Sequence, residues 1–266
     1  MKRPRAPRLP RRRPLPSLSI NRMIPNILTL LAVAAGLTSM RFALQDRWEH
    51  AVLAIGTAAV LDALDGRVAR LLKGSSKFGA ELDSLSDFVC FGVAPAMVLY
   101  LWAMQEAGRG GWILCMLFAM CMGLRLARFN VSLEDVNEPP WKANFFTGTP
   151  APAGAGLVLL PMMLSFQGGE AFFRNPWTVA FLLLAVGALT VSAIPTYSFK
   201  KVKIPNRWIL PTMLIVAGLA AFIVSVPWLT MSAIMILYIC SIPISYQAHR
   251  RLEAKDNPDG SGSGTT

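Results

Sequence analysis

The chain has 266 residues, of which 54% are hydrophobic and 15% charged. A soluble domain carries about 25% charged residues, so this composition excludes an ordinary soluble domain and indicates a membrane protein. The net charge of +11 does not indicate nucleic-acid binding, because no aromatic-interleaved soluble domain accompanies it. It indicates attraction to anionic lipid headgroups, at about 1 kcal/mol for each basic residue near the membrane surface.

The apolar residues come in long blocks, and several blocks reach the roughly 20 residues that a membrane-spanning helix needs. We predict an all-α fold class, a polytopic transmembrane helical bundle of about eight spans. A kink instead of a tight turn at residues 225–228 would join the last two spans and give seven. The predicted spans are 25–40, 51–72, 82–104, 112–130, 152–167, 177–195, 208–224 and 227–246.

The distribution of basic residues predicts the orientation, because cytoplasmic loops are enriched in Lys and Arg. With eight spans both termini lie on one side of the membrane. That side holds all of the 26 Lys and Arg residues except Arg41, Arg47, Arg109 and Arg174. We therefore predict that both termini are cytoplasmic.

Composition divides the chain into three parts. Residues 1–22 are rich in Arg and Pro and cannot bury a core, so we expect a basic disordered arm. Residues 23–248 form the membrane domain, and residues 249–266 form a flexible tail. The cysteines lie inside apolar blocks without a CxxC pair, so we interpret them as small buried hydrophobes. They are Cys90, Cys115, Cys121 and Cys240.

Four aspartates, Asp62, Asp65, Asp83 and Asp87, lie in or at the ends of two predicted spans. A carboxylate at membrane depth costs about 2.5–3.5 kcal/mol. Asp62 and Asp65 are three residues apart and share a helix face, as do Asp83 and Asp87, four residues apart. The connection at 74–76 is short, so the two helices are antiparallel neighbours. We expect all four side chains to face one point.

Clustered carboxylates repel one another unless cations lie between them, and hard oxygen ligands select magnesium, manganese or calcium. Two divalent ions about 3.5–4 Å apart suit phosphoryl chemistry. Gly66 permits close backbone approach, and Arg70 can form paired hydrogen bonds with a pyrophosphate. A single membrane Asp is often only a polar contact between helices. Four of them with interleaved Gly and Arg indicate a metal and phosphate site.

The segment from Asp62 to Asp87 resembles the signature of the CDP-alcohol phosphotransferase family, D-x2-D-G-x2-A-R-x8-G-x3-D-x3-D, at every fixed position. Residues 25–29, 124–130, 146–152 and 195–200 resemble motifs of its phosphatidylserine synthase branch. Three departures, Ala32 for Asn, Thr149 for Leu and a displaced Tyr197, fall outside the aspartate motif. They affect the prediction of which acceptor is used more than the prediction of the reaction type.

The resemblance implies residue roles and cofactors. Asp62, Asp65, Asp83 and Asp87 would hold two Mg²⁺ or Mn²⁺ ions, with Asp87 also the general base. The CDP moiety would be bound by Gly66, Arg70 and Gly79, and by Asn26 and Thr29 if these two are more than a helix start. The resemblance also implies a homodimer in a bacterial inner membrane, with the active site facing the cytoplasm.

The implied reaction transfers the phosphatidyl group of CDP-diacylglycerol to the hydroxyl of L-serine and releases CMP. Arg125, Arg128 and Lys200 lie at cytoplasmic span ends, where they can bind the serine carboxylate. Alternatively, they are anchors that reach toward lipid headgroups.

Two other functions remain open at this point. One is the same reaction with glycerol phosphate, inositol phosphate or choline as the acceptor. The other is a cation transporter, although transporters place such groups near the midplane between inverted repeats. Here the acids lie toward one side, and no internal symmetry is visible.

Overall fold

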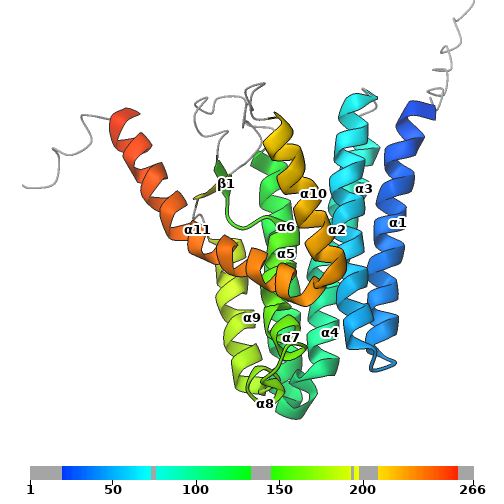
Figure 1. The fold of residues 1–266 in the computed structure, drawn as a ribbon, viewed down its shortest axis with the longest axis vertical. Coiled ribbons are helices and arrows are strands. Elements are labelled where there is room, and N and C mark those ends of the chain that lie inside the picture. The colour runs from blue at the N-terminus through cyan, green and yellow to red at the C-terminus, as the bar shows by residue number, and fades with distance from the viewer. Residues whose placement is uncertain (1–19, 73–75, 133–144, 193–194, 198–208, 257–266) are drawn as a thin grey trace, which may run out of the picture.

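The computed structural model describes residues 20–72, 76–132, 145–192, 195–197 and 209–256. They form a bundle of roughly parallel and antiparallel helices, with α10 and α11 at its side (Figure 1). The helical segments are α1 (Ile20–Ala43), α2 (Trp48–Leu71), α3 (Lys77–Asp87), η1 (Phe88–Val93), α4 (Ala94–Trp102), η2 (Met104–Ala107), α5 (Gly108–Ser132), α6 (Ala151–Val158), α7 (Leu160–Ser165), α8 (Glu170–Phe173), α9 (Pro176–Val191), α10 (Ile209–Ser225) and α11 (Pro227–Asp256).

The described part of each predicted apolar block is mainly helical, and Pro195 belongs to a strand. Most helix ends differ from the predicted ones by a few residues, and α11 continues to Asp256. Among the described residues, four helices are long and apolar enough to cross a membrane: Met23–Ala43, Lys77–Trp102, Met104–Val131 and Pro227–Ser245. α2 is not among them, because carboxylates and arginines interrupt its apolar sequence. The chain is therefore an integral membrane protein, while the count of eight spans stays a prediction.

Local sequence explains where helices begin and end. Ser76 caps α3, since its hydroxyl oxygen accepts a hydrogen bond from the Gly79 N–H at 3.0 Å. Asn175 caps α9 in the same way, directly before Pro176 at the first helical position. Val226 separates α10 from α11, which begins at Pro227; this agrees with the predicted turn and not with one kinked helix. α1 begins before residue 23 and α11 continues beyond residue 248, so the helices extend past the predicted domain limits.

One continuous rod, Lys77–Trp102, contains a π-helical segment that the sequence did not predict. This segment, η1, starts directly after Asp87, and its Cys90, Phe91 and Gly92 are buried. A π-helix is wider than an α-helix and is frequent at functional sites. Gly36 lets α1 approach this wide turn, because a Cβ there would lie 2.9 Å from the Cys90 sulfur.

The core lies where η1 and α4 meet α5, α6 and α9. Its large, fully buried side chains include Phe91, Phe118, Met122 and Leu183. Cys90 and Cys115 are buried as predicted, whereas Cys240 is exposed on α11.

The all-α prediction missed one short antiparallel ladder. β1 (Phe145–Thr147) pairs with β2 (Pro195–Tyr197), and Phe146 lies opposite Thr196. The ladder joins two of the motif segments that are far apart in the sequence. Gly148 follows β1 with φ +81°, and a Cβ there would lie 2.8 Å from the Thr190 carbonyl oxygen. Only glycine fits this position.

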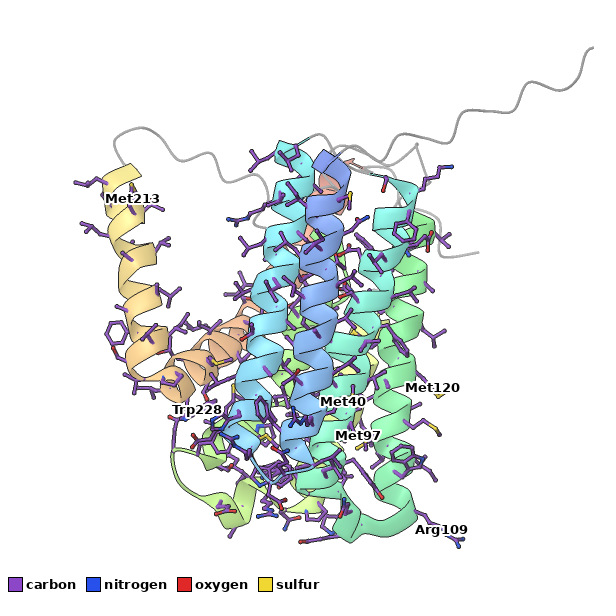
Figure 2. All side chains as sticks on the ribbon, turned by 90° about the vertical axis from the view of Figure 1, so that its right-hand side faces the viewer. Met40, Met97, Arg109, Met120, Met213 and Trp228 are labelled. Carbon is purple, nitrogen blue, oxygen red and sulfur yellow. The ribbon has the colours of Figure 1, made fainter. Side chains whose placement is uncertain are left out.

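The two ends of the bundle differ in their basic residues. The aspartate-bearing ends of α2 and α3 lie at the same end as the start of α1 and the end of α5 (Figure 1). The opposite end carries Arg41, Arg47, Arg109 and Arg174, which are the four residues predicted to be non-cytoplasmic; Figure 2 labels Arg109 there.

Candidate active site

Three carboxylates from α2 and α3 form a cluster toward the end of the bundle where α1 starts and α5 ends. Asp62, Asp83 and Asp87 each offer an oxygen, and the three oxygens lie within 4.8 Å of one another. Asp87 Oδ1 is buried and has no hydrogen-bond partner among the described residues. A hard divalent cation would satisfy this oxygen and offset the repulsion, so the cluster fits the predicted metal.

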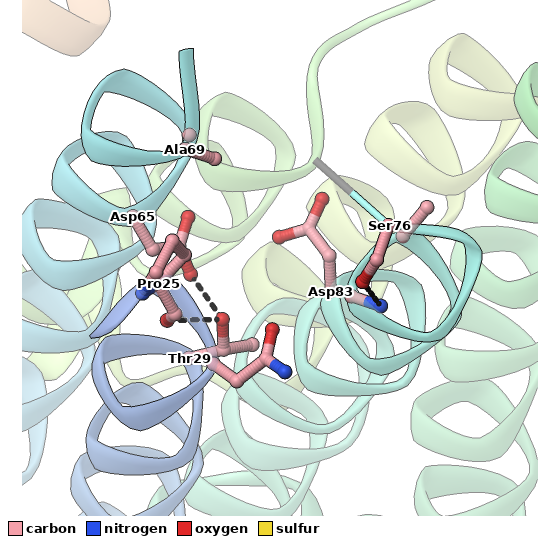
Figure 3. Close-up of a pocket in the computed structure, with 10 residues that line it drawn as sticks. Pro25, Thr29, Asp65, Ala69, Ser76 and Asp83 are labelled. Carbon is pink, nitrogen blue, oxygen red and sulfur yellow. Dashed lines mark hydrogen bonds between the residues drawn. The ribbon is translucent and has the colours of Figure 1, made fainter. Parts of the chain in front are cut away.

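Asp65, the fourth predicted metal ligand, lies outside this cluster. Its Oδ2 accepts a hydrogen bond from the Thr29 hydroxyl at 2.6 Å, and both residues are 4% exposed. Figure 3 shows Asp65 and Asp83 on opposite sides of a pocket. The structure therefore gathers three of the four aspartates and holds Asp65 against α1.

This pocket is a cavity of about 150 Å³ between α1, α2 and α3. Asp83 belongs to both the cavity wall and the carboxylate cluster, so the two are adjacent. The cavity is lined by Pro25, Asn26, Thr29, Asp65, Gly66, Ala69, Ser76, Gly79, Ala80 and Asp83. Four of the five predicted CDP-binding residues are thus brought together. The fifth, Arg70, is exposed and does not line the cavity.

The two glycines in the wall serve different purposes. A Cβ at Gly79 would lie 3.0 Å from Asn26 Oδ1 and 3.2 Å from Ser76 Oγ, so packing of α3 against α1 requires glycine there. A Cβ at Gly66 would meet no atom within 4 Å. Packing does not explain Gly66, and the free space beside it suits a ligand that approaches the backbone.

Arg125 on α5 faces the aspartates. Its charged and polar neighbours are Asp87, Tyr238 of α11 and Asp62. The Arg125 Nε is buried without a hydrogen-bond partner among the described residues, and the guanidinium lies 5.8 Å from the centre of the Phe129 ring. A buried guanidinium N–H that lacks an acceptor is costly, so this atom suits an anionic ligand.

Arg128, predicted to act with Arg125, has a different partner. It is exposed, and its Nη1 donates a hydrogen bond of 2.9 Å to the Val191 carbonyl oxygen at the end of α9. A cation is favourable at a helix C-terminus, so this contact ties α9 to α5. Lys200, the third predicted serine ligand, lies outside the described residues.

Sequence reasoning missed several contributors. Ser76 before an amphipathic segment is a cap signal that could have been recognised. The Asn130 amide donates a 2.9 Å hydrogen bond to Ser84 Oγ, which connects the end of α5 to α3 beside Asp83. Tyr238 is more than one hundred residues away from Arg125 in the sequence, and no local pattern predicts their proximity.

Fold and site together define a class: a membrane-embedded helical enzyme whose clustered carboxylates suit a divalent metal and a phosphate-bearing substrate. Residues 22–192 match the family described as CDP-alcohol phosphatidyltransferase. Residues 207–243 match a second family description, CDP-alcohol phosphatidyltransferase 2. The chain belongs to the CDP-alcohol phosphatidyltransferase family.

Similar proteins are named CDP-diacylglycerol–serine O-phosphatidyltransferase. The one from Mycobacterium tuberculosis is 40% identical over 86% of this chain and 80% of its own length. The Helicobacter pylori protein is 35% identical over 82% of this chain and 88% of its own length. The Bacillus subtilis protein is 34% identical over 70% of this chain and 98% of its own length.

Proposed function

We propose that this chain transfers the phosphatidyl group from CDP-diacylglycerol to the hydroxyl of L-serine, giving phosphatidylserine and CMP. The names of the similar proteins support both substrates. The main observation that supports this site is the buried Arg125 Nε beside Asp87, which has no hydrogen-bond partner in the described part of the chain. A carboxylate bound there brings its attached alcohol close to the aspartate cluster.

Asp62, Asp83 and Asp87 would hold Mg²⁺ or Mn²⁺, with Asp65 across the pocket as the fourth acidic group. We propose two ions. When bound, divalent metal supplies positive charge to the pyrophosphate, which is the main contribution to catalysis of phosphoryl transfer.

The cavity between α1 and α3 would receive the cytidine nucleotide. Asn26 lines it as a neutral donor and acceptor, and Gly66 leaves the backbone of α2 accessible. Thr29 acts indirectly, because its hydroxyl is directed at Asp65 and fixes that carboxylate. Arg70 reaches the phosphates only if its exposed side chain turns toward the cavity.

In the transfer step, Arg125 binds the serine carboxylate and Asp87 accepts the proton of the serine hydroxyl. The serine oxygen forms a bond to the β-phosphorus, which carries the diacylglycerol. The bond between that phosphorus and the bridging oxygen breaks, and CMP leaves with the bonding electrons. The proton on Asp87 is then released to solvent.

The active site opens to the cytoplasm in this proposal, because it lies at the end opposite Arg41, Arg47, Arg109 and Arg174. The side that is rich in basic residues is the cytoplasmic one. Residues 1–22 and 249–266 would flank a membrane domain of residues 23–248 that forms a homodimer in a bacterial inner membrane.

The decisive experiment supplies candidate acceptors in parallel to the purified protein with CDP-diacylglycerol. We expect CMP release and phosphatidylserine formation with serine, dependent on Mg²⁺ or Mn²⁺. A different lipid product from glycerol phosphate, inositol phosphate or choline would reassign the acceptor. Cation flux through liposomes without CMP release would support the transporter instead.

A further inference from the structure

The outer face of α2 carries three adjoining hollows that lie outside the nucleotide cavity and the carboxylate cluster. The first is lined by Arg67, Arg70 and Leu71 at the cytoplasmic end. The second shares Arg67 with it and continues along Ala63, Leu64 and Val60. The third shares Val60 with the second and opens beneath α10 and α11. Together they form one groove, which we call the α2 groove.

The deep part of the α2 groove is a cavity of about 570 Å³. α10 stands away from α2 there, and α11 crosses below it (Figure 2). Ile223 of α10 and Met231 and Met235 of α11 line the far wall. The hydroxyl of Thr57, a polar side chain in the lining, already donates to the Leu53 carbonyl oxygen at 2.8 Å. Such an apolar hollow at membrane depth suits hydrocarbon and offers little to water.

The shallow part of the α2 groove is basic. Arg67 and Arg70 are three residues apart, so they are neighbours on the helix surface. Both are exposed, and neither side chain has a hydrogen bond or ion pair within the described part of the chain. Two guanidinium groups that have no partner among the described residues can form paired hydrogen bonds with a phosphate at the membrane surface.

The shallow, basic part of the α2 groove faces away from the nucleotide cavity. Successive residues of an α-helix are rotated by about 100°, so the directions of Arg67 and Asp65 from the helix axis are about 160° apart. Asp65 is buried against Thr29 of α1. A phosphate bound at Arg67 is therefore on the other side of α2 from the nucleotide cavity.

The length of the α2 groove matches one lipid leaflet. From Arg67 down to Gly56 the helix descends about 16 Å at 1.5 Å per residue. Half of the hydrocarbon thickness of a bilayer is about 15 Å. A ligand with a phosphate at the surface and a chain reaching the midplane fits this distance.

We propose that the α2 groove binds one anionic phospholipid of the inner leaflet as a non-reacting ligand. Its phosphate lies at Arg67 and at the outward position of the Arg70 side chain, which does not line the nucleotide cavity. One acyl chain fills the cavity under α10 and α11. A zwitterionic lipid fits less well, because its ammonium group is repelled by the same arginines. The lipid holds α11 against α2, and α11 also carries Tyr238 beside Arg125.

The test measures lipid binding, so it does not depend on the proposed reaction. Delipidated protein is titrated with phosphatidylglycerol, with phosphatidylcholine as the comparison lipid, and bound lipid is counted by native mass spectrometry. Wild-type protein should bind one phosphatidylglycerol in preference to phosphatidylcholine and should unfold at a higher temperature with it. Arg67→Gln should weaken the binding about fivefold, and Ala63→Trp, which fills the groove, should abolish it.

Matched controls are Arg109→Gln, which removes an exposed arginine at the other end, and Met120→Trp, which adds an indole on the exposed face of α5. Both should bind as wild type does. Equal binding by Arg67→Gln and Arg109→Gln would overturn the proposal even if Ala63→Trp fails to fold. Displacement of phosphatidylglycerol by one equivalent of CDP-diacylglycerol would also overturn it, because the groove would then belong to the substrate.

Discussion

At the scale of single residues, the site concentrates negative charge that the chain only partly offsets. Carboxylate oxygens of Asp62, Asp83 and Asp87 lie within 4.8 Å of one another, and in the described part of the chain Arg125 is a cation beside them. The folded state is therefore strained by repulsion until further positive charge arrives. Metal binding should then stabilise the fold as well as support the reaction.

We predict that Mg²⁺ raises the unfolding temperature of the wild-type protein. At a free Mg²⁺ concentration one hundred times the dissociation constant, the free energy of unfolding should increase by about 2.7 kcal/mol. Asp87→Asn should lose activity by about 10²-fold or more, since it removes the proposed base, and it should respond less to Mg²⁺. Thermal unfolding with and without chelator, together with CMP release, checks both. Near wild-type turnover in Asp87→Asn would remove this residue from its assigned role.

Thr149, which stands where the phosphatidylserine synthase branch has Leu, lowers the stability of the fold. It is fully buried, and its hydroxyl has no hydrogen-bond partner among the described residues. A buried unsatisfied hydroxyl costs about 1–3 kcal/mol, and an apolar group of the same shape avoids that cost. Thr149→Val should therefore raise the unfolding temperature by a few degrees and leave CMP release intact. A lower unfolding temperature would mean that the hydroxyl has a partner in the membrane.

At the scale of elements, α5 presents two arginines with separate tasks. Arg125 faces the aspartates of α2 and α3, whereas Arg128 binds the end of α9. Arg125→Ala should raise the KM for serine about 10- to 100-fold, the worth of a hydrogen bond to a charged group, with little change for CDP-diacylglycerol. Arg128→Ala should lower thermal stability and leave the KM for serine unchanged. Steady-state kinetics with each substrate varied in turn distinguishes the two roles, and equal effects of both variants on serine would contradict this division.

The approach of α1 to η1 depends on Gly36. A Cβ there would lie 2.9 Å from the Cys90 sulfur and 3.2 Å from its Cα, so the helices must separate. Gly36→Ala should destabilise the protein by about 1–3 kcal/mol. Gly218→Ala on α10 is the matched control, because a Cβ there meets no atom within 4 Å and alanine favours helix. Loss of stability in the control but not in Gly36→Ala would contradict the packing argument.

Sequence patterns predicted the elements well because lipid imposes a simple length rule on apolar helices. They also predicted that Asp62, Asp83 and Asp87 meet, since spacing on each helix and a short connection are local facts. The position of Asp65 depends on Thr29, which is 36 residues away. The partner of Arg128 depends on where α9 ends, and the π-helical segment packs against both α1 and α5. No local pattern records such tertiary contacts.

At the scale of the whole molecule, the two ends of the bundle have opposite exposure to the cytoplasm in our proposal. A cysteine introduced at Arg109 or Arg174 in a cysteine-free background should react with a membrane-impermeant maleimide in intact cells. A cysteine at Lys77 or Arg67 should react only after the membrane is opened. The reverse pattern would invert the topology and move the active site to the other face.

The wide π-helical turn η1 between α3 and α4 sets the rotation of α4 about the helix axis relative to α3. Before it, Asp83 and Asp87 on α3 are directed at the carboxylate cluster, and after it Val98 and Leu99 on α4 are directed at the core. Removing one residue from Phe88–Val93 would turn the lower half by about 100° relative to the upper half. The aspartates of α3 and the core residues of α4 could then not both keep their present orientations. The number of residues in η1 is therefore as important for the site as the aspartates themselves.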